Sequence, residues 1–329
     1  MKFLHTSDWH IGSGARRIPN YLDRHSNSID QIYSIARQKG IKVIVVAGDI
    51  FQKNEPTSEE RDLLLKKLLQ YDDKFTTIIM EGNHDSIDFQ RSSIHFLKIL
   101  ESRNKFKNLR VSEVRPDIIN IDDNYFITLP SFRLKILKKM LKSVPKDRKS
   151  VIVVGHDTTI GTRSDTGYRL KSGIDLNKFK KFDVTYYAMG GIHLKQQLSL
   201  PNAFQCGSPI QHKFDEYPPK GVLIVDTDNP TEPEFIEVKS KPLVVVKEGG
   251  KIPKDAYVKL LLKKSSLKGK FPENVIATGS MNEAKLGKYK VKESITSGLK
   301  PFLKSLGLNR EEIKGCFKIL KKVRKKAGV

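Results

Sequence analysis

Residues 41–51 read IKVIVVAGDIF, and this stretch decides the fold of the chain. Its apolar run is rich in β-branched residues and is too short to span a bilayer, which favours a buried strand. A glycine and an aspartate follow at once, so the chain can turn sharply and present a carboxylate at the end of the strand. The same pattern of an apolar run before a turn predicts further strands at 1–7, 75–82, 125–130, 150–155, 184–190 and 220–226.

Helical patterns separate the early strands. Residues 26–40 and 58–73 carry apolar residues at helical spacing, and Ser58 is the expected N-cap of the second helix. Alternation of strands and helices predicts a layered α/β domain. Strands expected around 204–209, 220–226 and 232–238 have little helix between them, so part of the sheet should be antiparallel.

Charge and cysteine content restrict the class of protein. The formal net charge is +23, and residues 240–329 hold 23 Lys and Arg against 7 Asp and Glu. An excess of this kind favours a nucleic-acid partner over a merely solvated surface, because lysine-rich surfaces bind phosphate backbones by counterion release. Cys206 and Cys316 make no metal spacing and no disulfide framework, which is typical of a reducing compartment. We expect a soluble, cytoplasmic protein without a membrane segment.

Polar side chains follow five of the predicted strands. A lone histidine there is more often a hydrogen-bonded structural residue, but five strand ends meeting at one sheet edge indicate a binding site. The oxygen and nitrogen donors, without thiolates, suit Mn²⁺, Mg²⁺ or Fe²⁺, with Zn²⁺ also open. They outnumber the needs of one tetrahedral ion, so two ions bridged by a carboxylate use them better. The side chains are Asp8, His10, Asp49, Asn83, His84, Asp85, His156 and His193.

The order D-x-H, GD, GNHD, GH and G-x-H resembles the calcineurin-like metallophosphoesterases. More specifically, LHTSDWHIG (4–12), VAGDIF (46–51), GNHDS (82–86) and GSPIQHKFDEYPPKGVLIVD (207–226) resemble the SbcD-type nuclease subunits of DNA double-strand-break processing. The resemblance covers residues 1–240. It implies a four-layer metallophosphoesterase sandwich of mixed β-sheets flanked by helices over 1–240. A small α+β DNA-capping domain would follow over 241–291, and a basic helical hairpin over 292–329.

The resemblance also implies a role for each site residue. The first ion would be held by Asp8, His10 and His193, the second by Asn83 and His156, and Asp49 would bridge both. His84 would be the catalytic histidine, either as proton donor to the leaving oxygen or as stabiliser of the transition state. Asp85 would orient it, or would only complete an Asx-type turn. The implied cofactors are two divalent ions, Mn²⁺ foremost and Mg²⁺ as the alternative.

One position departs from the pattern of the family. The fifth motif is usually G-H-x-H, whose first histidine holds the second ion, and here that position is Gly191. Three interpretations are open: a weaker second site, a replacement ligand such as Asp157, or a subunit that has lost catalysis. We favour the weaker site, because the other six ligands are in place and six-coordinate ions accept water.

The activity implied by the resemblance is a metal-dependent DNA nuclease. It would act as a 3′-to-5′ exonuclease on duplex ends and as an endonuclease on single strands or hairpins, with an SbcC-type SMC-like ATPase. One alternative is a DNA-binding adaptor for that ATPase with weak or lost catalysis. Another is a phosphatase or phosphodiesterase for small phosphoesters, which the net charge of +23 disfavours.

Three further segments bear on partners. The amphipathic helices expected over 295–306 and 310–326 pack on their own domain or dock on the ATPase. Residues 89–100 resemble the region through which such subunits form homodimers. The basic stretch 133–149 lines the path of DNA or is a solvated helix face; its candidate DNA-binding residues are Arg133, Lys135, Lys138, Lys139 and Lys142.

Overall fold

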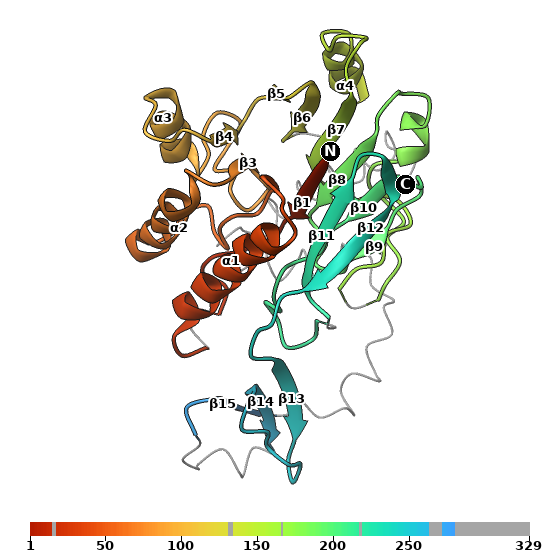
Figure 1. The fold of residues 1–329 in the computed structure, drawn as a ribbon. Coiled ribbons are helices and arrows are strands. Elements are labelled where there is room, and N and C mark those ends of the chain that lie inside the picture. Colours follow the sequence, from red (N-terminus) through yellow and green to blue (C-terminus); the bar gives the residue numbers. More distant parts are fainter. Residues whose placement is uncertain (15–17, 131–133, 166, 217–218, 263–271, 280–329) are drawn as a thin grey trace, which may run out of the picture. The chain divides into compact units, whose positions relative to one another are not determined.

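The computed structural model describes residues 1–14, 18–130, 134–165, 167–216, 219–262 and 272–279. Met1–Thr278 forms one compact unit, which holds two six-stranded sheets and one three-stranded sheet (Figure 1). Arg133 and the C-terminal helices expected over 292–329 lie outside the described residues. Within the described part of the chain, no helix has the length and apolar character needed to cross a membrane.

The first sheet has the order β12-β11-β1-β2-β3-β4. Four of its strands are parallel: β1 (Lys2–Thr6), β2 (Val43–Ala47), β3 (Thr76–Met80) and β4 (Leu109–Ser112). Strand β11 (Gly221–Asp226) is antiparallel to β1, and β12 (Asn229–Glu237) is antiparallel to β11, as expected for these two late strands.

The second sheet has the order β5-β6-β7-β8-β10-β9. Its parallel centre consists of β6 (Asn124–Leu129), β7 (Ser150–His156), β8 (Tyr186–Gly190) and β10 (Ala203–Gln205). The antiparallel edge strands are β5 (Asp117–Ile121) and β9 (Gln196–Gln197). Both sheets are therefore mixed, with their parallel carboxyl ends available for a site.

Alternation of side chains along the strands builds four layers. Phe3 and Val45 point into the core between the sheets, whereas Leu4 and Val46 pack under helices on the outer face of the first sheet. Those helices are α1 (Tyr21–Gln38), α2 (Ser58–Tyr71) and α3 (His95–Ser102). The second sheet is covered by α4 (Leu134–Leu141) and the 3₁₀ helix η1 (Leu176–Phe179). The expected sandwich of helices and mixed sheets is confirmed.

Three helix ends differ from the expectation. Helix α1 begins at Tyr21 rather than near residue 26. The N-cap of α2 is Thr57 rather than Ser58, because Thr57 and Glu60 complete a capping box. Helix α3 begins only at His95 rather than near residue 89, since Asp88 Oδ1 accepts the backbone N–H groups of Gln90 and Arg91 and holds a turn there.

The third sheet contains β13 (Leu243–Lys247), β14 (Tyr257–Leu262) and β15 (Val275–Gly279). Its core includes Val258, Leu260 and Val275 and is separate from the cores of the large sheets. Strand β13 lies just after residue 240, in a stretch rich in Pro, Gly and Lys for which no strand was predicted. The boundaries at 240 and 291 stay a prediction.

Candidate metal centre

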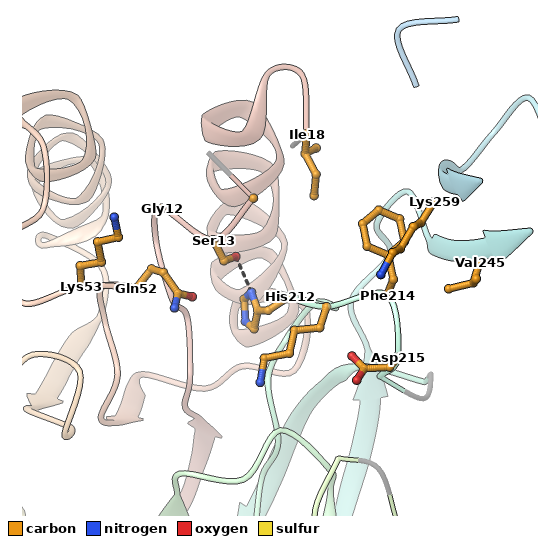
Figure 2. A pocket seen from close by; sticks show the side chains of 12 residues that line it. Gly12, Ser13, Ile18, Gln52, Lys53, His212, Phe214, Asp215, Val245 and Lys259 are labelled. Atoms are coloured by element: carbon orange, nitrogen blue, oxygen red, sulfur yellow. Dashed lines mark hydrogen bonds between the residues drawn. The ribbon is translucent and has the colours of Figure 1, made fainter. Parts of the chain in front are cut away.

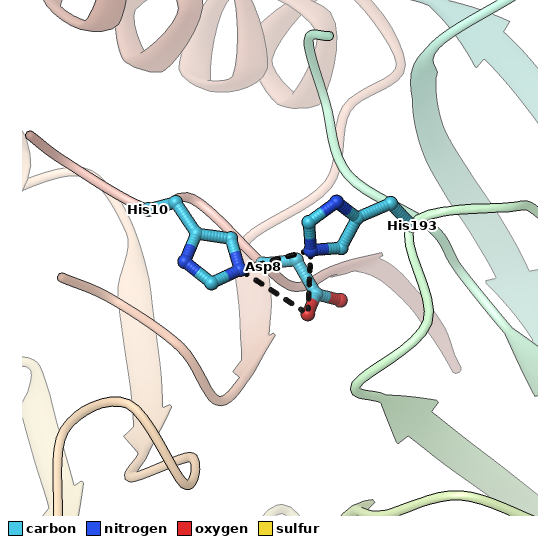
Figure 3. A group of neighbouring side chains, drawn as sticks. All are labelled: Asp8, His10 and His193. Carbon is cyan, nitrogen blue, oxygen red and sulfur yellow. Dashed lines mark hydrogen bonds and ion pairs between the residues drawn. The ribbon is translucent and has the colours of Figure 1, made fainter. Parts of the chain in front are cut away.

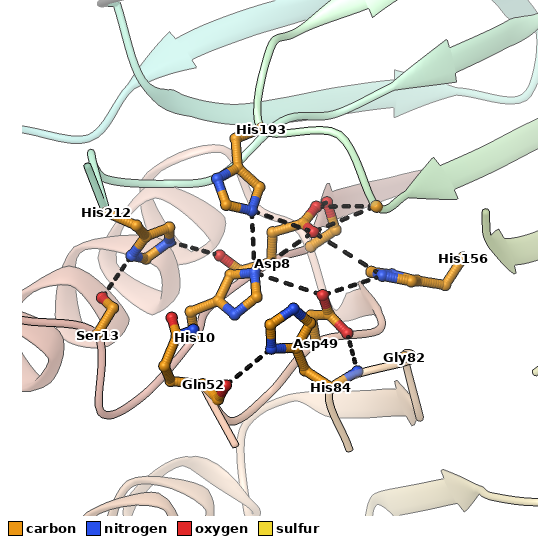
Figure 4. A network of polar contacts seen from close by, with 12 residues as sticks. Asp8, His10, Ser13, Asp49, Gln52, Gly82, His84, His156, His193 and His212 are labelled. Carbon is orange, nitrogen blue, oxygen red and sulfur yellow. Dashed lines mark hydrogen bonds and ion pairs between the residues drawn. The ribbon is translucent and has the colours of Figure 1, made fainter. Parts of the chain in front are cut away.

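The centre lies where β1, β2 and β3 of one sheet and β7 and β8 of the other end (Figure 4). The loops after β1 and β2 run side by side, since Asp8 N–H donates to the Gly48 carbonyl at 2.9 Å and His10 N–H to the Asp49 carbonyl at 3.0 Å. Asp8, His10 and Asp49 have φ angles of 53°, 43° and 53°. Non-glycine residues rarely adopt this conformation, and such strain concentrates at functional sites.

Asp8, His10 and His193 form the first group of donors (Figure 3). The Nε2 atoms of the two histidines lie 2.9 Å apart, and Asp8 Oδ1 lies 3.9 Å from each of them. This separation is that of a hydrogen bond in which one ring carries its proton on Nε2, whereas as metal ligands both nitrogens would present lone pairs. These are the three residues that the resemblance assigns to the first ion.

Asp49 and His156 form the other half of the centre. Asp49 Oδ2 lies 3.2 Å from His156 Nε2 and 3.4 Å from His10 Nε2, so this carboxylate belongs to donor groups on both sides. His156 Nδ1 donates to the Ala47 carbonyl at 2.7 Å, which turns Nε2 toward the carboxylates. Gly48 is required here, because a Cβ would lie 2.3 Å from His156 Nδ1. The arrangement suits the bridging role expected of Asp49.

The electrostatics of the centre call for positive charge. Burial raises the pKa of Asp8 above its ordinary value. Burial alone would lower the pKa of His156, but the Asp49 and Asp8 carboxylates outweigh it and raise that pKa to about 10. Without ions, protons must balance these buried carboxylates. A divalent cation with a preference for oxygen and nitrogen donors fits the same demand, so the residues present suit the ions expected.

Asn83 and Gly191 border the second half of the centre. Both line a cavity of about 600 Å³, together with His156, Asp157 and Ile136 of helix α4. A Cβ at Gly191 would lie 3.3 Å from His156 Nε2, so a side chain there would face this half of the centre. Among the described donor groups none includes Asp157, whose Oδ1 accepts from the Thr158 N–H at 2.7 Å.

The backbone explains why residue 191 is glycine. Its φ of +105° is one that L-residues rarely adopt, and its N–H lies 3.2 Å from both oxygens of the Asp8 carboxylate.

We expect Gly191→His to lower the stability of the metal-free protein by about 1–2 kcal/mol and not to strengthen the second site. Thermal unfolding in EDTA and Mn²⁺ calorimetry measure both. The control is Gly161→Ala. Its φ is also positive, at +88°, but no atom lies within 4 Å of the added Cβ, so it measures the effect of the backbone conformation alone.

His84 is held by the loop after β2. Its N–H donates to Asp49 Oδ1 at 2.9 Å, and its ring Nδ1 lies 2.7 Å from the Gln52 carbonyl. A carbonyl only accepts, so Nδ1 carries the proton and Nε2 is the ring atom left for a substrate. The half-buried ring lines an open cavity with Asn83 and Lys53. This geometry suits a side chain that acts on substrate.

Asp85 plays a part different from the one expected. Its carboxylate is fully buried and accepts the N–H groups of Ile50, Phe51 and Gly82 at 2.9–3.0 Å. Burial raises its pKa to about 7, against the effect of these donors. The ring of His84 is oriented by a carbonyl instead. Asp85 ties the loop after β3 to the loop after β2, which the GNHD pattern could not distinguish from a direct contact.

Sequence reasoning missed a chain of buried polar groups beneath Asp8 (Figure 4). His212 Nε2 donates to the Asp8 carbonyl at 2.9 Å, and its Nδ1 lies 2.6 Å from Ser13 Oγ. His25 Nε2 in turn lies 3.2 Å from the Ser13 carbonyl. A buried histidine pair this far apart in sequence has no local pattern. The one available signal was that His212 falls in the motif at 207–226.

The same motif supplies Glu216 and Lys220, which were also missed. Glu216 Oε1 lies 2.8 Å from His193 Nδ1, and Lys220 Nζ lies 2.8 Å from Glu216 Oε2. Burial would raise the pKa of Glu216, but His193 and Lys220 outweigh it and lower that pKa to about 2. Asp165 Oδ2 is farther from the ring, 3.6 Å from His193 Nδ1. Glu216 therefore holds the ring of His193, an expected ligand, from the side away from Asp8.

A second cavity, of about 580 Å³, opens beside the first half of the centre (Figure 2). Its wall includes Ser13, Gln52 and His212, whose backbone or side chains also hold the centre. Lys53 and Lys213 line it and are exposed. Positive side chains beside a phosphoester site attract a polyanion.

The structure describes most of the basic stretch 133–149. Lys135, Lys138 and Lys139 are exposed on helix α4, which packs on the second sheet through the buried Leu137. Lys142 follows the helix and is also exposed. The helix ends at Leu141, so the basic stretch 133–149 is not one continuous helix.

Comparison with known proteins places the chain in a family. Residues 1–195 match the model of the calcineurin-like phosphoesterases. The SbcD component of the nuclease SbcCD from Staphylococcus saprophyticus is 27% identical over 279 residues, 76% of this chain and 72% of that protein. The SbcD component from Escherichia coli K12 is 24% identical over 249 residues, 66% of this chain and 62% of that protein.

An archaeal relative is named as a DNA repair protein. The DNA double-strand break repair protein Mre11 of Sulfolobus acidocaldarius is 26% identical over 199 residues, 60% of this chain and half of that protein. Among solved structures, an archaeal phosphodiesterase matches 72% of this chain and 99% of its own, at 14% identity and a TM-score of 0.36. The chain belongs to the calcineurin-like phosphoesterase family and is a metal-dependent phosphodiesterase.

Proposed function

We propose that this chain is a DNA nuclease that processes broken ends together with an SbcC-type ATPase, as a 3′-to-5′ exonuclease on duplex ends and an endonuclease on single strands or hairpins. The observation that carries the proposal is the convergence of three imidazoles from two sheets on one carboxylate oxygen, Asp8 Oδ1. The named relatives and the net charge of +23 support DNA as the substrate.

The protein groups divide the work of phosphodiester hydrolysis. Asp8, His10 and His193 would hold one ion, and Asn83 and His156 the other, with Asp49 between them. Two divalent ions at such a centre clamp a phosphate and supply a nucleophilic water at neutral pH. His84, with Nδ1 held by a carbonyl, would present Nε2 to the leaving oxygen or to the charge on the phosphate.

The test is cleavage of end-labelled duplex and hairpin DNA, with Mn²⁺ or Mg²⁺, beside bis(p-nitrophenyl) phosphate. A nuclease degrades the DNA in a metal-dependent manner. Hydrolysis of the small diester alone would favour the small-molecule phosphodiesterase. Tight DNA binding without cleavage of either substrate would favour the DNA-binding adaptor. This is the second candidate function, because Gly191 stands where the family usually has a metal-binding histidine.

The two halves of the centre should bind Mn²⁺ unequally. The second half lacks a side chain at residue 191, and loss of one contact at a metal site weakens binding by about tenfold or more. We expect calorimetry of the full chain with MnCl₂ to resolve one tight and one weak site. Two equal, tight sites would show that another residue has taken the vacant place.

Binding of duplex DNA should depend on the lysines beside the centre. We expect Lys53→Ala/Lys213→Ala to lower affinity without changing sequence preference, since phosphate contacts carry no base information. The slope of log affinity against log salt should fall by about two. Lys66→Ala/Lys74→Ala, at exposed lysines on and after α2, is the matched control. Equal slopes for both double variants would place the DNA elsewhere. The basic residues 280–329 lie outside the described part.

A further inference from the structure

Two oppositely charged side chains are buried behind His193. Glu216 is 4% exposed and Lys220 is 6% exposed. A buried charge is costly unless it is paired and hydrogen-bonded, so the hydrogen-bond partners of these two side chains indicate their role. Glu216 Oε2 accepts from Lys220 Nζ at 2.8 Å and from the His212 N–H at 3.1 Å. Its other oxygen, Oε1, lies 2.8 Å from Nδ1 of His193.

Both members of the pair hold the same residue. Lys220 Nζ donates to the His193 carbonyl at 2.7 Å, while Glu216 accepts from the His193 ring. The backbone and the ring of one residue are thus fastened by two groups that also bind each other. The carboxylate fixes the proton on Nδ1, which leaves Nε2 as the lone-pair atom, and Nε2 is the atom 2.9 Å from His10 Nε2.

The other half of the centre is supported differently. His156 is held through Nδ1 by the Ala47 carbonyl, a neutral acceptor on β2. A carboxylate behind a ligand histidine raises the basicity of the ring more than a carbonyl does. The charged support is thus on the side of Asp8, His10 and His193.

We propose that Glu216 and Lys220 are positioning residues that set the metal affinity of the first half of the centre, independently of the second half. The proposal rests on the two-ion centre of the proposed function. It accounts for a pair of buried charges that neither the strand ends nor the ligand set requires. It also gives the expected difference in affinity a second cause besides Gly191, because among the described residues only the first half has a charged group behind a histidine of the centre.

The test is calorimetric titration of the metal-free full chain with MnCl₂ alone. Glu216→Gln keeps an acceptor for His193 Nδ1 but removes the charge, so we expect the tight site to weaken by about 10- to 100-fold. The weak site should stay within about twofold, since it does not depend on this support. Asp165→Asn, which removes a carboxylate 3.6 Å from the same nitrogen, should leave both sites unchanged.

A second variant keeps the test valid if Glu216→Gln folds poorly with Lys220 left unpaired. Glu216→Gln/Lys220→Met removes both charges together, leaves no buried charge alone, and should show the same selective loss. Unfolding temperatures in EDTA report the metal-free fold of each variant. Equal weakening of both sites, in step with a lower unfolding temperature, would assign the pair to stability alone and overturn the proposal.

The failure of this inference and of the proposed function are separable. A wild type that cleaves DNA but whose tight Mn²⁺ site is unaffected in both variants contradicts the positioning role only. A wild type that cleaves no DNA, yet loses its tight site on Glu216→Gln, contradicts the nuclease function and leaves the positioning role standing. A wild type without a tight Mn²⁺ site contradicts both.

Discussion

Asp49→Asn should abolish DNA cleavage, by at least about 1000-fold, because we expect this carboxylate to bridge both ions and to support charge stabilisation worth several kcal/mol. Asn keeps the size of the side chain and its acceptor for the His84 N–H. It also tolerates the left-handed backbone at residue 49, where φ is 53°, better than alanine does. We therefore expect the fold to survive while both ions are lost. Cleavage rates and Mn²⁺ binding are the two measurements.

The matched control for this variant is Asp123→Asn. Asp123 has a similar φ of 64° and lies in the turn before β6, at the end of the strands opposite the centre. The Asp123→Asn protein should cleave DNA at the wild-type rate. A folded Asp49→Asn protein with near-normal cleavage would contradict the two-ion centre, because no other carboxylate of the described residues lies between His10 and His156 at 3.2–3.4 Å.

His84→Ala should lose cleavage by about 10²- to 10⁴-fold while Mn²⁺ and DNA binding stay intact. The bond to Asp49 is made by the backbone N–H of His84 and remains when the ring is removed. The ring itself is bonded to the Gln52 carbonyl, so its removal leaves the expected ligands in place. The substrate separates the two roles that the sequence left open. If His84 donates a proton to the leaving oxygen, bis(p-nitrophenyl) phosphate, whose leaving group needs no proton, should be hydrolysed at nearly the wild-type rate.

The alternative role gives a different result. A histidine that stabilises charge on the phosphate serves both substrates, so both rates should fall together in His84→Ala. Loss of Mn²⁺ binding in the variant would contradict either role and would make His84 a ligand. The donor group of His10, Asp49 and His84 makes that outcome worth measuring.

The sequence by itself predicted most strands of the two large sheets and the polar side chains that follow them. Short β-branched runs such as 43–47 favour buried strands, and polar residues that follow neighbouring parallel strands fall at one edge of their sheet. Asp8 and Asp49 therefore follow from local pattern, whereas the packing of the second sheet on the first brings His193 to them. The helix ends were less predictable, since Thr57 and Asp88 act through side-chain contacts that composition alone does not rank.

Only the tertiary structure decided what surrounds the ligands. Glu216 meets His193 across 23 residues, and His212 meets Asp8 across 204, so no periodicity in the chain links them. The role of Asp85 and the reason for Gly191 were likewise hidden, because three backbone amides and a φ of +105° exist only in the folded chain. Strand ends are a local property of sequence, whereas buried charges are placed by the partners that folding brings to them.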